Sequence, residues 1–438
     1  MAFHIDPVAG RLAFTGARLL DPATGLDTIG DLLTDGEVIA GFGPGLFAEG
    51  VPEGAAVVDC AGLCLAPGLV DIRTQVREPG EEHKGTLAST GQAATAGGVT
   101  TMVCLPNTLP VIDDMSVVEF VARRARRVGL TKVYPYGAIT QGLAGSKLAE
   151  LGMLAEAGAV AFTDGVRAVA DAQVMRQALN YARTFGLLLV EHPEEPSLAA
   201  DGDMNAGEMA TRLGLTGIPR EAEVIMVERD LRLVELTGSR LHFGHISTGQ
   251  SVDAIRRAKA RGLPVTCDTA PPYFALNENA IGEYRTFAKL SPPLRSEADR
   301  LAIVEGLADG TIDAIASDHA PQDEDAKRLP FGQAAFGGVG LETLLPVSLE
   351  LYHNGHLTLL EVLALLTHRP AHVFGLPAGR LAVGAAADLT LFDPDRAWQV
   401  REYELHSKSK NTPFDYRPVQ GRVVLTVVDG RRVFALDP

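Results

Sequence analysis

The 438-residue sequence lacks any apolar run near the roughly 20 residues that a helix needs to cross a bilayer, and its start lacks a basic segment followed by an apolar one. It also has fewer basic than acidic residues, because 39 Lys and Arg compare with 55 Asp and Glu, which gives a net charge of −16. An acidic chain repels phosphate backbones. We therefore expect a cytoplasmic protein with no membrane segment and no nucleic-acid partner.

Cysteine is scarce as well. The four cysteines form no C-x-x-C pair, and each lies among apolar neighbours. This pattern argues against a disulfide framework and a cysteine zinc site, so we expect reduced core residues. The 46 Gly and 26 Pro are scattered along the chain, which excludes collagenous and low-complexity classes.

The middle of the chain, residues 67–377, has a repeated pattern. Short runs rich in Val, Ile and Leu alternate with longer stretches of helical periodicity, which is typical of βα units around a parallel sheet. Eight such runs in roughly 310 residues fit a TIM (β/α)8 barrel better than a doubly wound sheet. The expected strands are 69–76, 100–105, 132–139, 159–164, 187–192, 240–248, 264–269 and 314–318.

The two ends of the chain show short alternating strand patterns broken by turns. Neither residues 1–66 nor residues 378–438 can hold a core alone, so we expect them to pair into one small composite β-sandwich domain. The predicted organisation is therefore a β-domain built from both termini, with the barrel of residues 67–377 between them.

Polar residues recur where the predicted barrel strands end. In a barrel the carboxyl ends of the strands carry the functional groups, so recurrence at successive strands indicates a site. The residues concerned are Asp71, Arg73, Gln75, Arg77, Asn107, Asp164, His192, His245, Asp318 and His319.

Several segments in these positions carry a resemblance to a known family. The strand-1 region "APGLVDIRTQVREPGEEHKGT", together with "EHPEE", "FGHIST", "SPPLR", "ASDHAPQ", "AFGGVGLETLLP" and "SKSKNTPF", closely resembles the bacterial dihydroorotases of the amidohydrolase superfamily. The resemblance is collinear from about residue 60 to 430. It implies a (β/α)8 barrel and the zinc-dependent, reversible cyclisation of N-carbamoyl-L-aspartate to dihydroorotate.

The sequence departs from the family at the metal ligands. The family motif on strand 1 is D-x-H-x-H-x-R, and here Arg73 and Gln75 replace both histidines. Arg cannot coordinate a metal, and Gln is a poor zinc ligand. A gap-free alignment of "FTDGV" also puts Gly165 at the family's ligating carboxylate and keeps only Asp164, although a one-residue slip could restore it.

Part of the family site is retained. The resemblance assigns His192, His245 and Asp318 to residual metal binding, with Asp318 as a vestigial general base. It assigns vestigial substrate binding to Arg77, Asn107, Phe336 and Gly337, whereas Ser291 and Gln322 replace family residues.

Three functions remain open. The leading hypothesis is a pseudoenzyme of pyrimidine biosynthesis that is an oligomeric structural partner of aspartate transcarbamoylase, as the resemblance implies for non-catalytic homologues. The first alternative is an active zinc-dependent cyclic amidohydrolase with a mononuclear or atypical site. The second is a binding protein that senses carbamoyl aspartate or dihydroorotate. We expect no bound cofactor, or at most one zinc ion.

Arg73 and Asp318 should lie close together, because strands 1 and 8 are neighbours where a barrel closes. A buried carboxylate without its metal needs another cation. We therefore predict that the Arg73 guanidinium lies in the barrel mouth within salt-bridge distance of Asp318.

Overall fold

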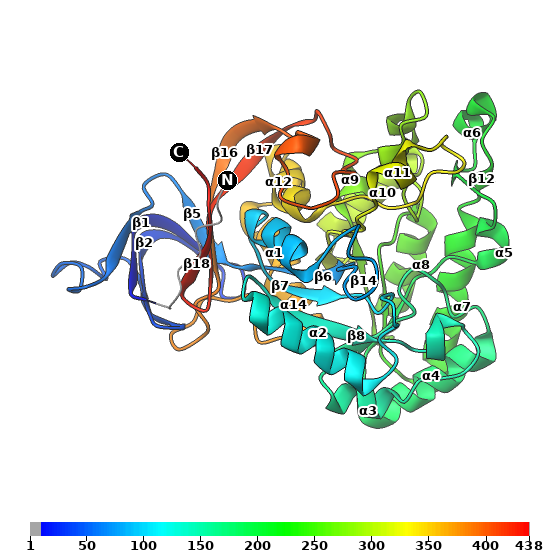
Figure 1. Cartoon of the computed structure of the whole chain (residues 1–438), viewed down its shortest axis with the longest axis horizontal. Helices are drawn as coiled ribbons and strands as arrows, with labels where there is room; N and C mark the ends of the chain where they lie inside the picture. The colour runs from blue at the N-terminus through cyan, green and yellow to red at the C-terminus, as the bar shows by residue number, and fades with distance from the viewer. Residues whose placement is uncertain (1–9, 438) are drawn as a thin grey trace.

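A computed structural model describes residues 10–437 of the chain and shows a closed barrel beside a second sheet (Figure 1). The barrel sheet holds eight parallel strands in the spatial order β15-β14-β13-β10-β9-β8-β7-β6. These strands are β6 (Leu69–Thr74), β7 (Val99–Cys104), β8 (Lys132–Gly137), β9 (Ala161–Phe162), β10 (Leu189–Glu191), β13 (Leu241–Phe243), β14 (Val265–Thr269) and β15 (Ala314–Ile315). The predicted TIM barrel is confirmed.

The barrel closes between its first and last strands. Thr74 on β6 forms a parallel bridge with His319, just after β15. The amide of Gln75 donates to the His319 carbonyl at 2.8 Å. All eight predicted runs contain a strand, but most strands are shorter than predicted. Strand β9 spans two residues, although the amides of Val160 and Thr163 on either side of it still donate to the β8 carbonyls of Pro135 and Gly137 at 3.1 and 2.9 Å.

Helices follow the strands and cover the outside of the barrel (Figure 1). The longer ones are α1 (Leu87–Ala96), α2 (Met115–Val128), α4 (Ala172–Phe185), α7 (Glu221–Thr237), α8 (Gly249–Ala260), α10 (Glu297–Ala308), α12 (Leu344–His353), α13 (Leu359–Leu366) and α14 (His368–Phe374). Shorter elements are α3 (Leu151–Glu156), α5 (Pro196–Ala199), α6 (Glu208–Leu213), α9 (Pro271–Ala275), α11 (Glu324–Arg328), β11 (Met204–Asn205) and β12 (Gly217–Ile218).

The helix α4 shows how local sequence sets these elements. Asp171 caps its first turn by accepting a hydrogen bond from the Gln173 amide at 2.7 Å. Val174 and Ala178, four residues apart, are buried on one face. Gly186 ends the helix with a φ of 66°, a left-handed conformation that glycine adopts without strain.

The second sheet combines both ends of the chain. From the N-terminal side it contains β1 (Leu12–Asp21), β2 (Leu26–Asp35), β3 (Val38–Gly43), β4 (Ala56–Asp59) and β5 (Cys64–Pro67), and from the C-terminal side β16 (Leu389–Gln399), β17 (Pro418–Val428) and β18 (Arg431–Ala435). Phe14, Leu65, Leu389 and Val427 share its core. The predicted composite β-domain is present, while its boundaries at residues 66 and 378 stay predictions.

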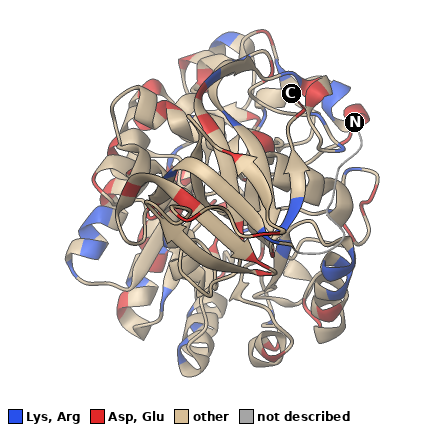
Figure 2. Ribbon diagram, turned by 90° about the vertical axis from the view of Figure 1, so that its left-hand side faces the viewer, with Lys and Arg blue, Asp and Glu red and all other residues tan. Residues whose placement is uncertain are grey.

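The positions of the charged residues and of the cysteines, and the hydropathy of the helices, agree with the fold. Seen from the side of the second sheet, the central strands are mostly uncharged and the charged residues of both signs lie mainly around them (Figure 2). All four cysteines are buried, and none of them forms a disulfide bond within residues 10–437. No helix within residues 10–437 is long and apolar enough to cross a membrane.

Candidate functional site at the barrel mouth

The parallel strands bring the candidate residues to one end of the barrel. Arg73 lies on β6, His192 directly follows β10, His245 lies two residues after β13, and Asp318 lies three residues after β15. All four are largely buried. The carboxyl ends of parallel strands meet at one edge, so residues far apart in sequence form a single cluster.

Arg73 forms the predicted ion pair with Asp318. Its Nε donates to Asp318 Oδ1 at 2.9 Å, and its Nη2 donates to the Gly165 carbonyl at 3.1 Å. The remaining nitrogen, Nη1, is buried and has no hydrogen-bond partner among the residues that the structure describes. The guanidinium thus lies inside the mouth among the positions that the family resemblance assigns to metal ligands.

Two histidines extend the cluster. His245 Nδ1 lies 3.3 Å from Asp318 Oδ2, and His245 Nε2 lies 2.7 Å from His192 Nδ1. Burial and the charge of Arg73 lower the pKa of His245 to about 4, so its ring is neutral at pH 7. Since a carboxylate only accepts, His245 donates from Nδ1 to Asp318 and accepts from His192.

The Asp318 carboxylate stays ionised in this setting. Burial alone raises the pKa of Asp318, but its pairs with His245 and Arg73 outweigh burial and bring that pKa below its ordinary value. The backbone at the site is also unusual, because His245 and Asp318 have φ values of 41° and 48°. Such conformations cluster at sites where a fold fixes a side chain.

Zinc, which the family resemblance implies, does not fit these residues. A tetrahedral zinc bound to two ring nitrogens at about 2.0–2.1 Å holds them about 3.3 Å apart, whereas the facing nitrogens of His192 and His245 are 2.7 Å apart. The space beside Asp318 is about 10 Å³, enough for about one water molecule. Within residues 10–437, no three His, Cys, Asp or Glu side chains are grouped to hold a metal ion.

The strand-4 carboxylate faces away from this cluster. Asp164 accepts hydrogen bonds from the amides of Ile139 and Thr140 at 3.0 and 2.9 Å, and from the Thr140 hydroxyl. It therefore anchors the loop after β8. Gly165 has a φ of 74° and contributes its carbonyl to Arg73. Both contacts agree with the gap-free alignment, in which Gly165 takes the position of the family's ligating carboxylate.

The predicted substrate-binding residues bond to the protein itself. Arg77 Nε donates to the Pro321 carbonyl at 3.1 Å, and its Nη1 forms an ion pair with Glu81 at 2.8 Å. Asn107 Nδ2 donates to Gln75 Oε1 at 3.2 Å. Gln75, which stands where the family has a metal ligand, thus accepts a hydrogen bond from a residue that follows the neighbouring strand.

The other predicted positions lie in the loops around the barrel mouth, which we call the rim. Gln322 Nε2 donates to the Phe336 carbonyl at 2.8 Å, and the Gly337 amide donates to the Lys289 carbonyl at 3.0 Å. Ser291 donates to Glu194 at 3.3 Å. These contacts join the rim segments to one another.

Sequence reasoning missed two residues of the site. Glu194 lies 3.6 Å from His192 Nε2, and both line a cleft of about 480 Å³. Arg295 does not line this cleft, but it is buried and its charge helps to lower the pKa of Glu194. Its Nη2 has no hydrogen-bond partner within residues 10–437. Both belong to quoted motifs, "EHPEE" and "SPPLR", but local sequence does not tell which polar residue of a motif lies at the site.

Asp71, also predicted at this end, has a structural position. It accepts from the Ser317 amide at 2.7 Å and the Ser317 hydroxyl at 2.6 Å, which joins the first and last strand regions. Burial raises the pKa of Asp71 to about 6.

Comparisons with known proteins identify the family. A model described as dihydro-orotase-like matches residues 62–251, and one described as amidohydrolase family matches residues 241–434. A protein named dihydroorotase from Wolbachia sp. (strain wRi) is 47% identical over 427 residues, covering 97% of this chain and 96% of the relative. The dihydroorotase of Desulforapulum autotrophicum is 47% identical over 423 residues, covering 97% and 99%.

Solved structures support the same placement. The L-hydantoinase (dihydropyrimidinase) of Arthrobacter aurescens superposes with a TM-score of 0.85 at 25% identity, over 97% of this chain and 96% of that one. The dihydropyrimidinase of Brevibacillus agri, at 22% identity and a TM-score of 0.82, shares the fold. The chain therefore belongs to the dihydroorotase-like family of the amidohydrolase superfamily.

Proposed function

We propose that this chain is a dihydroorotase homologue of pyrimidine biosynthesis in which the zinc-dependent reaction is lost. The observation that carries the proposal is the position of Arg73. Its guanidinium is buried and forms an ion pair with the carboxylate of Asp318. In the family reaction, the residue at this position would bind metal and accept a proton. Closing or opening a cyclic amide by that route requires a metal that lowers the pKa of water from 15.7 to about 7.

The charge of Arg73 opposes metal binding. Two like unit charges 4 Å apart repel by about 4 kcal/mol at an effective dielectric constant of about 20, and a divalent ion doubles this. Arg stays protonated in proteins, so this repulsion cannot be relieved by titration. We infer that Arg73 replaces the metal as counter-ion of Asp318, which preserves the barrel mouth without its chemistry.

The role we propose for such a homologue is structural, as an oligomeric partner of aspartate transcarbamoylase. This part of the proposal rests on the family resemblance, and no contact surface is assigned. Size-exclusion chromatography of the chain with the transcarbamoylase of its own organism should give a larger complex. Unchanged elution of both proteins at micromolar concentration contradicts the partner role.

The comparisons favour a second candidate, a working cyclic amidohydrolase that interconverts carbamoyl aspartate and dihydroorotate. Relatives named dihydroorotase match 97% of the chain at 46–47% identity. These names support this candidate more directly than they support a partner role, and none of the comparisons supports a loss of activity. It requires Arg73 to leave the mouth so that His192, His245 and Asp318 can hold at most one zinc ion.

One experiment separates the two candidates. The purified chain is analysed for zinc and assayed in both directions with and without added Zn²⁺. The first candidate predicts less than one equivalent of zinc and no turnover. Turnover that persists in a His356→Ala control, an exposed histidine outside the site, and disappears in His192→Ala establishes the second candidate instead.

A further inference from the structure

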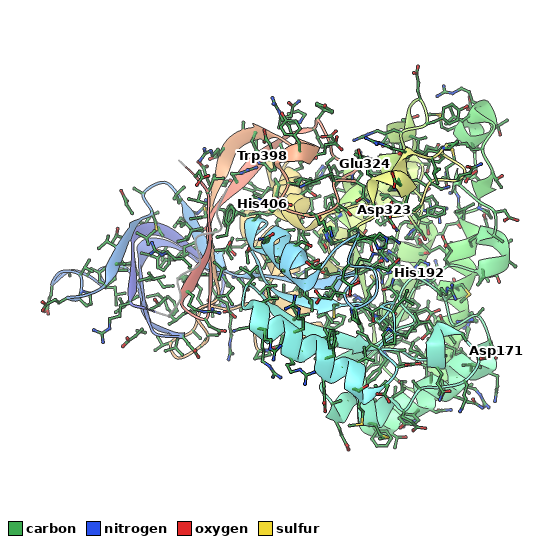
Figure 3. All side chains as sticks on the ribbon, in the orientation of Figure 1. Asp171, His192, Asp323, Glu324, Trp398 and His406 are labelled. Atoms are coloured by element: carbon green, nitrogen blue, oxygen red, sulfur yellow. The ribbon has the colours of Figure 1, made fainter. Side chains whose placement is uncertain are left out.

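A second cavity, of about 640 Å³, is lined by an unusual share of the chain's lysines. The sequence contains eight lysines, and Lys327, Lys408 and Lys410 all line this cavity. It is separate from the cleft at His192: Figure 3 shows Asp323, which lines the lysine cavity, and Asp171, which lines the cleft, on opposite sides of His192.

Within residues 10–437, none of the three lysines has a carboxylate at ion-pair distance, although the charges of Glu342 and Glu402 act on Lys410. Four of the other lysines form ion pairs, namely Lys84, Lys132, Lys259 and Lys289. In the part of the chain that the structure describes, Lys327, Lys408 and Lys410 form none. Unpaired ammonium groups gathered in one cavity are unexpected in a chain with a net charge of −16.

Lys327 brings a buried charge to the cavity wall. Its Nζ donates to the carbonyls of Ala335, Thr286 and Lys289 at 2.7, 3.0 and 3.3 Å, so its hydrogen bonds are satisfied but its charge is not neutralised. Burial, with the nearby charge of Lys289, lowers the pKa of Lys327 to about 7. An anion in the cavity would stabilise the charged form.

The loop that carries the other two lysines is held in place. It is the "SKSKNTPF" segment, in which buried Ser407 and Ser409 alternate with Lys408 and Lys410. Ser409 donates to the Lys84 carbonyl at 2.7 Å. Asn411 donates to the Gly337 carbonyl at 3.0 Å and accepts from the Gln322 amide at 3.2 Å.

Both loop ammonium groups have donors to spare. Lys408 donates to the Glu82 carbonyl at 2.7 Å, and Lys410 donates to the Leu405 carbonyl. An ammonium group has three N–H donors, so within residues 10–437 each of the two lysines has two donors without a protein partner. A fixed loop with free donors binds without a large ordering cost.

Acidic residues also line the cavity, but most of them have partners. Glu324 is paired with Arg328, and Asp323 lies 3.6 Å from His83. Burial raises the pKa of Glu402, and Lys410 is close enough for its charge to act on this carboxylate. The lining residues therefore carry an excess of one positive formal charge, with Lys327, Arg328, Lys408 and Lys410 against Asp323, Glu324 and Glu402.

We propose that this cavity binds a small organic dianion, carrying a phosphate group or two carboxylates. The volume suits a small-molecule ligand, and lysine binds phosphate as a point charge. The site does not involve Arg73 or Asp318, although Gln322, which replaces a family site residue, lies on its wall.

Isothermal titration calorimetry of the full chain tests the proposal, with pyrophosphate and succinate as probes. We expect saturable binding of at least one probe that weakens with salt. The variant Lys408→Met, at an exposed lysine, should lower the affinity for the probe. The double variant Lys408→Met/Lys410→Met should lower it by about tenfold or more. The control Lys147→Met, an exposed lysine outside the cavity that also lacks a carboxylate partner, should leave it unchanged.

The probes also identify the ligand chemistry, because binding of pyrophosphate alone indicates a phosphate and binding of succinate alone indicates a dicarboxylate. Thermal unfolding of each variant checks that the fold is retained. The proposal is overturned if neither probe binds saturably, if the folded Lys408→Met variant binds as tightly as the natural chain, or if Lys147→Met loses as much affinity.

Discussion

The buried pair of Arg73 and Asp318 can be measured by a double-mutant cycle with Arg73→Met and Asp318→Asn, using urea unfolding. Removing one partner of a fully buried ion pair costs about 3–5 kcal/mol, because the other charge stays buried. The Arg73 side chain is 2% exposed and that of Asp318 is 16% exposed. Since some water reaches Asp318, we expect the lower end, about 3 kcal/mol, for Arg73→Met.

The double variant should be more stable than the sum of the single losses predicts. Removing both charges leaves neither one unpaired, so a coupling energy of about 2 kcal/mol is expected. The matched control is the cycle Arg18→Met with Asp27→Asn, in which the paired atoms are 2.7 Å apart but the side chains are 38% and 35% exposed. That pair should couple by less than about 1 kcal/mol.

Two results would refute this reasoning. One is a coupling energy for Arg73 and Asp318 no larger than that of the exposed control. The other is an Arg73→Met variant as stable as the natural chain, which would mean that water or a bound cation already neutralises Asp318.

Three further predictions concern chemistry, pH and packing. Arg73→His with Gln75→His should not produce dihydroorotase turnover, because Gly165 still supplies no carboxylate; near-family rates with zinc would contradict this. The folded chain holds a proton on Asp71 up to about pH 6, whereas an unfolded Asp releases it near about pH 4. The free energy of unfolding should therefore fall as pH rises through that window; Asp71→Asn should flatten this part of the curve in urea titrations, and an unchanged slope would count against it. Leu389→Ala, in the core shared by both chain ends, should lower the free energy of unfolding by about 2–5 kcal/mol, and a loss below about 1 kcal/mol would indicate a loosely packed sheet.

The sequence by itself determined the fold and the neighbours at barrel closure. Hydrophobic periodicity is a local property, so each of the eight predicted runs contains a strand. Because a closed parallel barrel makes its first and last strands neighbours, and because a buried carboxylate needs a cation, the pairing of Arg73 with Asp318 could be predicted from the sequence. The loss of ligands at positions 73 and 75 could likewise be recognised from residue chemistry.

Only the tertiary structure decided where side chains point and what they contact. Asp164 faces the loop after β8, and Arg77 faces Glu81, although sequence position suits both equally to the barrel mouth. Lys327 and Lys408 are far apart in the chain and share one cavity because two rim segments meet there. Such contacts depend on loop paths and on competing hydrogen-bond partners across the fold, which local periodicity does not encode.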